Sequence, residues 1–227
     1  MFIFQDNEGF NFSLESVLLP RFVTINKKVK KIMDIGTGNA PIPLILSRRT
    51  SALIIGVEIQ KEICKLAIES VNINGLESRI EIINGDIKEI YKNIESDSFD
   101  VITCNPPYFR LSEKSNVNNN DKKTIARHEK ELTLDDIFLI ARKLLKNGGY
   151  ISIVHRPERL VDIIEVMRKN NIEPKRIRFV HPHSNENANI LLIEGVKNGK
   201  RGIKIDSPLI SHEEDGKYSK EVMEFFE

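Results

Sequence analysis

A strand, a tight turn and a helix start follow one another in the sequence Lys31-Ile32-Met33-Asp34-Ile35-Gly36-Thr37-Gly38-Asn39-Ala40. The apolar run predicts a buried strand, and Gly36 and Gly38 let the backbone turn sharply and come close to a ligand. Pro41 and Pro43 follow, in a first helical turn where a missing N–H costs little. Strand, acidic Asp34, turn and helix together predict an α/β sheet that binds its ligand at the strand ends. Dinucleotide-binding folds share this layout, but Pro41 occupies the position of their third glycine.

Two further apolar runs end in acidic residues. The run 52–58 predicts a strand ending at Glu58, twenty residues beyond Gly38, where such folds bind ribose hydroxyls through a carboxylate. The alternative for Glu58 is an ordinary exposed loop residue. The run 79–83 predicts a third strand, followed by Asp86. Asp86 can N-cap a short helix over 87–94, and this role is compatible with a ligand contact by the same side chain.

The fourth predicted strand, Phe99-Asp100-Val101-Ile102, leads into Thr103-Cys104-Asn105-Pro106-Pro107-Tyr108. Neither proline can donate to a sheet ladder, so the strand ends there and leaves Asn105 at its carboxyl end. The amide oxygen of Asn105 and the carbonyl of Pro106 supply two acceptors, and Tyr108 supplies a flat face. This combination suits a planar group that carries an NH2. The alternative is a strand that merely ends in a Pro-Pro turn.

The remaining patterns predict three more strands and several amphipathic helices. Ser13 precedes the first helix, and Asn74-Gly75 ends the helix that contains residues 63–71. A helix over 134–145 is expected to stop at Gly148-Gly149. The later elements are a strand over 150–155, a helix from Pro157 to about Asn170, and strands over 176–181 and 188–196. No helix separates the last two strands, so they should form an antiparallel hairpin at the sheet edge.

Composition is ordinary for a soluble globular protein, with 40% hydrophobic and 30% charged residues in 227. We expect one domain over 1–227, with a tail over 203–227 that carries no strong pattern. Two cysteines, and no metal-ligand spacing, indicate a reducing compartment without a metal site. No run of about eighteen apolar residues exists, so we expect a cytoplasmic protein without a membrane partner. A monomer is expected, although the oligomeric state is left open.

Charge is unevenly distributed. Residues 141–210 contain 14 Lys or Arg and 7 Asp or Glu, whereas residues 211–227 contain 2 Lys and 6 acids. A basic C-terminal half is compatible with a nucleic-acid partner, with Lys175, Arg176 and Arg178 as first candidates for phosphate contacts. A solvated face of mixed charge explains the count equally well.

The Asn105–Tyr108 motif resembles the catalytic motif of class I S-adenosylmethionine-dependent amino-methyltransferases, which methylate exocyclic or amide nitrogens. The resemblance implies a Rossmann-like fold: a seven-stranded, mostly parallel sheet with a reversed C-terminal hairpin and helices on both faces. It implies that residues 1–24 fold over the cofactor, and the alternative for this segment is a plain amphipathic helix. The stretch 110–123 has no apolar period and leaves directly from the motif, so we expect a lid that orders on substrate; a disordered loop is the alternative. The implied catalytic residues are Asn105, Pro106, Pro107 and Tyr108, and the implied cofactor-binding residues are Asp34, Gly36, Gly38, Glu58, Asp86 and Asn105. In this family the position of Asp86 contacts the adenine amino group of the cofactor.

A finer resemblance covers nearly the whole chain. Residues 126–129, 144–149, 154–160 and 173–182 are similar to bacterial tRNA adenine N6-methyltransferases that modify adenine 37, next to the anticodon of a valine tRNA. This implies a tRNA anticodon loop as substrate and adds Arg127 and His128 as candidate RNA contacts. The alternatives for His128 are a general base and a solvated or structural histidine. The same motif also supports methylation of protein glutamine N5 or of a ribosomal RNA nitrogen. A rival of another class is a non-catalytic RNA-binding protein on the same scaffold.

Overall fold

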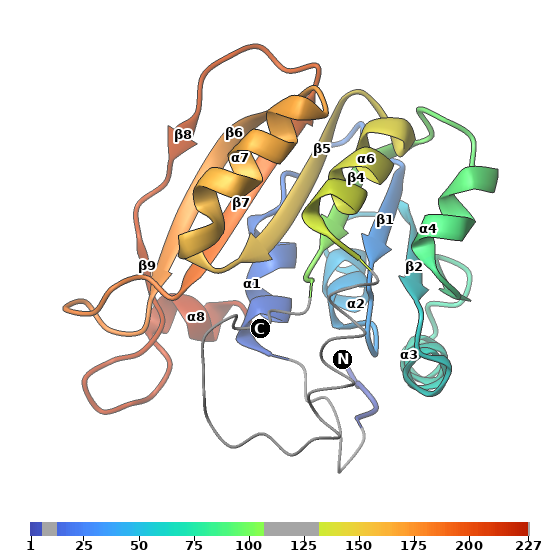
Figure 1. Ribbon diagram of the computed structural model, residues 1–227. Coiled ribbons are helices and arrows are strands. Elements are labelled where there is room, and N and C mark those ends of the chain that lie inside the picture. The colour runs from blue at the N-terminus through green and yellow to red at the C-terminus, as the bar shows by residue number, and fades with distance from the viewer. Residues whose placement is uncertain (6–12, 107–131, 227) are drawn as a thin grey trace, which may run out of the picture.

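The computed structural model describes residues 1–5, 13–106 and 132–226. Its central feature is one twisted sheet with the strand order β3-β2-β1-β4-β5-β7-β6-β8 (Figure 1). The first five of these pair in parallel. They are β1 (Lys31–Ile35), β2 (Leu53–Glu58), β3 (Ile80–Asn84), β4 (Phe99–Cys104) and β5 (Leu145–His155).

The expected reversed hairpin is confirmed. β7 (Ile190–Lys197) lies between β5 and β6 (Ile172–His181) and is antiparallel to both. In the part of the chain that the structure describes, the sheet nevertheless has nine strands rather than seven, because β8 (Lys204–Ile205) and β9 (Leu209–Ile210) pair in parallel with β6. Strands of two residues are too short for an alternating pattern, so the sequence of the tail did not indicate them.

Helices cover both faces of the sheet, as expected (Figure 1). One apolar cluster contains side chains of α1 (Leu14–Phe22), α2 (Pro41–Ser47), α3 (Lys61–Ile73) and α8 (Lys220–Glu224). The cluster on the other face contains side chains of α4 (Ile87–Ile90), α6 (Leu134–Leu144) and α7 (Leu160–Lys169). Two 3-10 turns, η1 (Tyr91–Asn93) and η2 (Pro157–Arg159), flank α4 and α7.

The helix expected over 134–145 is present, but the role expected for Gly148 and Gly149 as its stop is wrong. α6 stops at Leu144 and β5 begins directly at Leu145, which pairs with Phe99 of β4. Gly148 and Gly149, expected to end the helix, therefore lie inside β5, where the register with β4 shifts. Glycines inside a strand commonly mark such an irregularity, and the sequence alone does not distinguish it from a helix stop.

The register of the parallel strands brings their carboxyl ends to one edge. Ile35 at the end of β1 lies beside Val57 of β2 on one side and Cys104 of β4 on the other. Glu58 in turn pairs with Asn84 at the end of β3. The residues that follow these strands are the glycine turn, Asp86 and Asn105, and all of them therefore belong to this edge.

Candidate functional site

The glycine turn after β1 has the conformation that its sequence predicts. Gly36 and Gly38 have φ values of +67° and +57°, which a residue with a side chain adopts only under strain. The backbone N–H groups of Gly36 and Thr37 donate to the carbonyl of Val57 at 2.9 and 3.0 Å. A Cβ added at either glycine would meet nothing within 4 Å, so the turn borders open space. The turn thus leaves room for a ligand against its backbone.

Glu58 is buried rather than an exposed loop residue, with 5% of its surface accessible. Its Oε2 accepts a hydrogen bond from the N–H of Gly38 at 3.0 Å, and its Oε1 accepts one from the N–H of Gln60 at 2.8 Å. A carboxylate oxygen has a second lone pair, so each can accept a further hydroxyl. Glu58 therefore fixes the glycine turn and retains acceptor capacity for a sugar diol.

Asp34 is completely buried beneath this turn. Its Oδ2 accepts from the Thr37 hydroxyl at 2.7 Å and its Oδ1 from the Thr103 hydroxyl at 2.6 Å. Burial raises the pKa of Asp34 to about 7 and outweighs both hydrogen bonds, and the charge of Glu58 adds to the increase. With both oxygens turned to protein hydroxyls, Asp34 is placed to hold the turn against β4 rather than to touch a cofactor.

Asp86 caps α4, the first of its two anticipated roles. Its Oδ1 accepts from the N–H of Lys88 at 2.8 Å. The side chain of Asn84 just before it donates to the carbonyl of Glu58 at 2.9 Å, which ties the ends of β2 and β3 together. The cap uses Oδ1, so the second role, acceptance from an adenine amino group, is compatible with it.

Asn105 follows β4 at the same edge, and the next residue, Pro106, is buried. The side-chain Nδ2 of Asn105 donates to the hydroxyl oxygen of Ser16 on α1 at 3.1 Å. Ser16 is 7% exposed. The sequence does not single out Ser16, because a serine inside an amphipathic helix gives no signal of its own. The motif residues Pro107 and Tyr108, the 110–123 loop, and Arg127 and His128 lie outside the described residues.

The first residues of the chain run close to the glycine turn. The N–H of Phe4 donates to the hydroxyl of Ser70 on α3 at 2.9 Å, and its carbonyl accepts from the side chain of Asn39 at 2.8 Å. Asn39 itself follows the turn. This placement is compatible with the expectation that residues 1–24 cover the cofactor.

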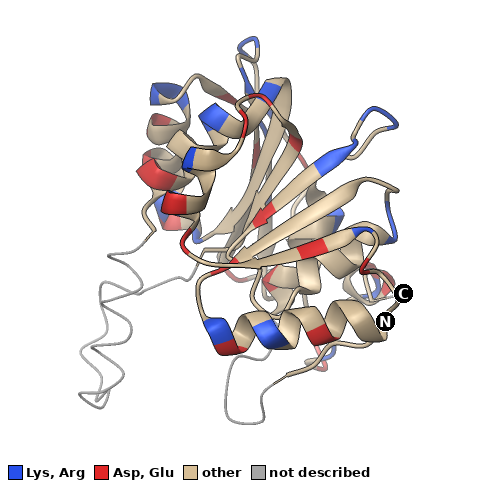
Figure 2. Cartoon of the chain, turned by 90° about the vertical axis from the view of Figure 1, so that its right-hand side faces the viewer, with Lys and Arg blue, Asp and Glu red and all other residues tan. Residues whose placement is uncertain are grey.

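The three basic residues expected to bind RNA all have partners within the protein. Lys175 donates to the carbonyls of Lys200 and Gly202 at 3.0 and 2.6 Å. Arg178 donates to the carbonyl of Ser207 at 3.0 Å and pairs with Glu221 at 2.7 Å. These contacts fasten the C-terminal tail to β6. Figure 2 shows Lys and Arg segments interspersed with Asp and Glu in this view, which is the mixed pattern that the charge count allowed.

Arg176 belongs to a charged cluster around the end of α1. Its guanidinium donates to the carbonyl of Phe22 and lies 3.5 Å from a carboxylate oxygen of Glu194. Arg49 donates to the carbonyls of Pro20 and Val23, and burial together with the nearby Arg21 and Arg176 lowers the pKa of Arg49. These arginines satisfy carbonyls that α1 leaves unpaired at its end, and so fix α1 on the sheet.

Glu194 balances part of this positive charge. It is 2% exposed and accepts from the N–H and hydroxyl of Thr24 at 2.7 and 2.6 Å and from the hydroxyl of Ser152 at 2.8 Å. A buried carboxylate is tolerated when hydrogen bonds and cations surround it. The segment after α1 is thereby bonded directly to β7 and is linked to Ser152 of β5 through Glu194.

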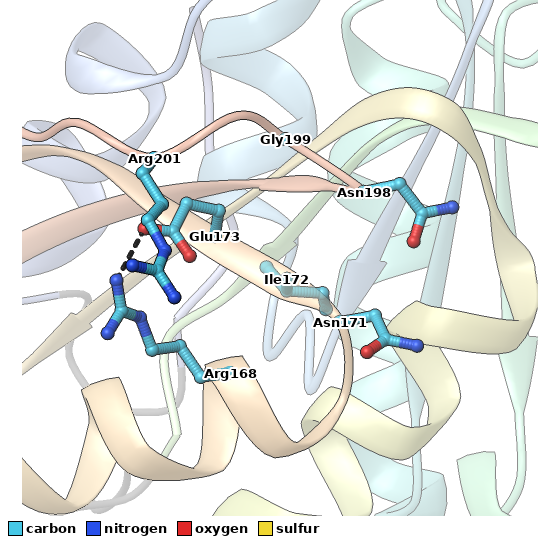
Figure 3. Close-up of a pocket in the computed structure, with 7 residues that line it drawn as sticks. All are labelled: Arg168, Asn171, Ile172, Glu173, Asn198, Gly199 and Arg201. Atoms are coloured by element: carbon cyan, nitrogen blue, oxygen red, sulfur yellow. Dashed lines mark hydrogen bonds and ion pairs between the residues drawn. The ribbon is translucent and has the colours of Figure 1, made fainter.

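Two open pockets lie at the end of the sheet opposite to the carboxyl ends of the parallel strands. One, of about 350 Å³, lies where β6 begins and β7 ends. There Arg168 and Arg201 point toward each other beside Glu173, and Arg168 pairs with Glu173 at 2.8 Å (Figure 3). The other, of about 370 Å³, lies near Asp100 and Lys146, where β4 and β5 begin. Both are remote from the carboxyl ends of the parallel strands.

Two findings bear on the expected cofactors and partners. Over residues 1–5, 13–106 and 132–226, no group of three or more His, Cys, Asp or Glu side chains is arranged to hold a metal ion. Within these same ranges, no helix has both the length and the apolar character needed to cross a membrane. Cys64 and Cys104 are both buried and unpaired.

Comparisons with known proteins agree with this geometry. A family profile described as "Methyltransferase domain" matches residues 26–221. A tRNA1(Val) (adenine(37)-N6)-methyltransferase from Parabacteroides distasonis is 30% identical over 85% of this chain and 79% of its own length. A protein of the same name from Bacteroides fragilis is 24% identical over 99% of this chain and 94% of its own length.

Solved structures show the same fold at lower identity. A predicted O-methyltransferase from Agrobacterium tumefaciens has a TM-score of 0.74 at 20% identity and covers 93% of this chain and 94% of its own. Geranyl diphosphate C-methyltransferase from Streptomyces coelicolor, solved with S-adenosyl-L-homocysteine, has a TM-score of 0.59 at 10% identity. It covers 80% of this chain and 79% of its own. At these identities the likeness shows the fold alone.

Proposed function

Because this chain belongs to the S-adenosylmethionine-dependent methyltransferases, and within them to the tRNA1(Val) (adenine(37)-N6)-methyltransferase family, we propose that it methylates the exocyclic N6 of adenine 37 in a valine tRNA. The observation that carries the proposal is the position of Asn105. It follows β4 at the sheet edge shared with the glycine turn and Glu58. Such a substrate also places the enzyme in the cytoplasm.

The residues of this edge fit the cofactor. The diol of a ribose would be bound by Glu58, a sulfonium amino acid would lie against the backbone of Gly36 and Gly38, and Asp86 would accept from the adenine amino group. When bound, S-adenosylmethionine supplies an electrophilic methyl group. Open space at the glycine turn and a buried carboxylate beside it support this assignment.

The chemistry proposed for Asn105 follows from the poor nucleophilicity of the target. The lone pair of an adenine amino nitrogen is delocalised into the ring. Two acceptors, the Asn105 amide oxygen and the Pro106 carbonyl, would bind the two N–H groups and favour a pyramidal nitrogen with its lone pair toward the methyl group. Holding nitrogen and methyl in line supplies much of the rate gain. No strong base is required, because the nitrogen becomes acidic only as it is alkylated.

Recognition of the base is proposed for the second half of the motif. Tyr108 would stack on the target adenine, a contact worth roughly 1–3 kcal/mol. A base in an anticodon loop is already unpaired, so its extraction into the site costs less than extraction from a duplex. Arg127 and His128 are proposed to contact the RNA backbone near the site.

A methyl-transfer assay with labelled cofactor tests the proposal. Purified protein is offered total tRNA, ribosomal RNA and release-factor protein in parallel. We expect label in a valine tRNA, recovered as N6-methyladenosine after digestion. Label in release factor would indicate glutamine N5-methylation, and label in ribosomal RNA would indicate another RNA target. Cofactor binding without transfer to any substrate would favour the non-catalytic RNA-binding alternative.

A further inference from the structure

We propose that Ser16 on α1 is a positioning residue that sets the orientation of the Asn105 amide. The inference deepens the proposed function, since it concerns how the acceptor of that same site is presented. It begins with the 3.1 Å hydrogen bond from Asn105 Nδ2 to Ser16 Oγ. Ser16 is buried, so water is largely excluded from replacing it as acceptor.

A carboxamide has one donor end and one acceptor end, and rotation by 180° exchanges them. Only the orientation that turns the oxygen toward an incoming amine is productive. In the reversed orientation, the Asn105 NH2 would face the substrate NH2, donor against donor. In the structure it is Nδ2 that faces Ser16, so the oxygen lies on the branch of the amide that faces away from the Ser16 hydroxyl.

The same hydrogen bond strengthens the acceptor. Donation by Nδ2 shifts electron density toward the amide oxygen, as in any chain of polarised hydrogen bonds. The oxygen thus becomes a better acceptor for the N–H groups of the target. Ser16 acts through Asn105 and need not touch the substrate.

The position of Ser16 is held from the far end of its helix. Arg49 donates to the carbonyls of Pro20 and Val23, and Arg176 donates to that of Phe22. The buried Glu194 bonds Thr24, just beyond the helix. A helix anchored in this way presents its hydroxyl at a fixed place against the end of β4. This arrangement gives the buried charged cluster a role in the active site that it does not contact.

Kinetics of single variants are the first test. Ser16→Ala removes the acceptor and should lower kcat roughly three- to tenfold, the rate equivalent of one neutral hydrogen bond. The affinity for S-adenosylhomocysteine should stay within about twofold, since the Ser16 hydroxyl bonds Asn105. Ser16→Thr keeps the hydroxyl and should restore most of the rate. The matched control is Ser47→Ala, because Ser47 is another buried helix serine, and its hydroxyl donates to the carbonyl of Leu44 at 2.7 Å within its own helix.

A double-mutant cycle separates positioning from a general structural effect. In an Asn105→Ala background there is no amide to orient, so adding Ser16→Ala should change kcat by less than about twofold. An additive loss in the double variant would overturn the proposal and assign Ser16 to the packing of α1. An unchanged or increased kcat in the single Ser16→Ala variant would also overturn it.

A measurement without substrate distinguishes this inference from the proposed function. In nitrogen-15 labelled protein, the side-chain NH2 signal of Asn105 is identified by its loss in Asn105→Asp. The signal should move upfield in Ser16→Ala and stay near its wild-type position in Ser16→Thr and Ser47→Ala. An unmoved signal would overturn the inference even if wild-type protein methylates tRNA. A moved signal in a protein inactive on tRNA would support the positioning while the proposed substrate fails.

Discussion

The carboxyl group of Asp34 on β1 accepts a hydrogen bond of 2.6 Å from the hydroxyl of Thr103 on β4. Thr103 lies two residues before Asn105, and Asp34 lies two residues before Gly36. This contact therefore joins the strand that carries the cofactor turn to the strand that carries the proposed catalytic amide. A buried, titratable group thus adds a side-chain bond to the β1–β4 ladder directly beneath the site.

Asp34→Asn should change the pH dependence of stability. The folded pKa of Asp34, about 7, lies above its ordinary value of 3.8, so the folded state holds this proton more tightly than the unfolded state. The stability due to that proton is complete below pH 3.8 and is lost as the pH rises through about 7. The asparagine variant does not titrate there. The difference in free energy of unfolding, variant minus wild type, should therefore be about 2 kcal/mol larger at pH 8 than at pH 5.5. Urea unfolding at both pH values measures the difference, and parallel changes in both proteins would contradict the prediction.

Glu58→Ala should weaken cofactor binding by about 1–3 kcal/mol, the scale of hydrogen bonds to a charged group. Part of the loss comes from the sugar hydroxyls and part from the N–H of Gly38, which loses its 3.0 Å acceptor. Calorimetry with S-adenosylhomocysteine measures the affinity. Glu62→Ala is the control, because Glu62 is an exposed residue of α3 that pairs with Lys65. Equal affinity of the Glu58 variant and wild type would remove Glu58 from the site.

Asn105→Ala should change cofactor affinity little, because the other cofactor-binding residues lie at other strand ends. It should raise the barrier to methyl transfer by about 2–4 kcal/mol, the usual cost of one preorganised transition-state hydrogen bond. Single-turnover rates and calorimetry measure the two quantities separately. Asn105→Asp keeps the size and an acceptor oxygen but adds a negative charge, so it should retain part of the activity. Wild-type rates in Asn105→Ala would show that the proposed chemistry is wrong.

Arg176→Ala should lower stability more than it affects RNA binding. The guanidinium pairs with Glu194 and stacks on the Phe22 ring at 4.2 Å, with about a quarter of the side chain exposed. We expect a loss of about 2–3 kcal/mol, below the roughly 3–5 kcal/mol typical when a fully buried pair is broken. Denaturant unfolding measures it. Arg168→Ala is the control, because Arg168 forms a half-exposed pair with Glu173.

Lys175 and Arg178 test the predicted RNA surface more directly than Arg176 does. If their cations also bind phosphates, the double alanine variant should weaken tRNA binding and reduce the salt slope by roughly 0.7–0.9 for each phosphate that is no longer neutralised. Filter binding at several salt concentrations measures the slope. A slope identical to that of wild type would mean that these side chains serve only to fasten the tail to β6.

The pattern of apolar residues along the sequence was enough to predict the strands that form the site. Apolar runs ending in Gly36, Glu58 and Asn105 identify parallel strands, and parallel strands must present their carboxyl ends at one edge. The reversed hairpin could be predicted for a similar reason, since no helix lies between β6 and β7. Each of these predictions needed only neighbouring residues and a topological rule.

Other features depend on contacts between distant residues and gave no local signal. Counting charges cannot distinguish an arginine that binds phosphate from one that caps a helix, and Arg176 does the latter through Phe22. The contact between Ser16 and Asn105 spans 89 positions. The strands β8 and β9 exist only because β6 offers them an edge to pair with. Sequence reasoning located the strand ends, but not what supports the groups placed there.

The insertion of β7 between β5 and β6 imposes an order on the assembly of this protein during synthesis. β6 is made before β7 but cannot join the sheet until β7 has emerged to bond with β5. β7 also carries Glu194, which binds Thr24 beside the first helix of the chain. One bond that holds the segment after the first helix therefore comes from one of the last strands, and a ribosome that stalls before residue 194 holds a chain in which this bond to Thr24 has yet to form.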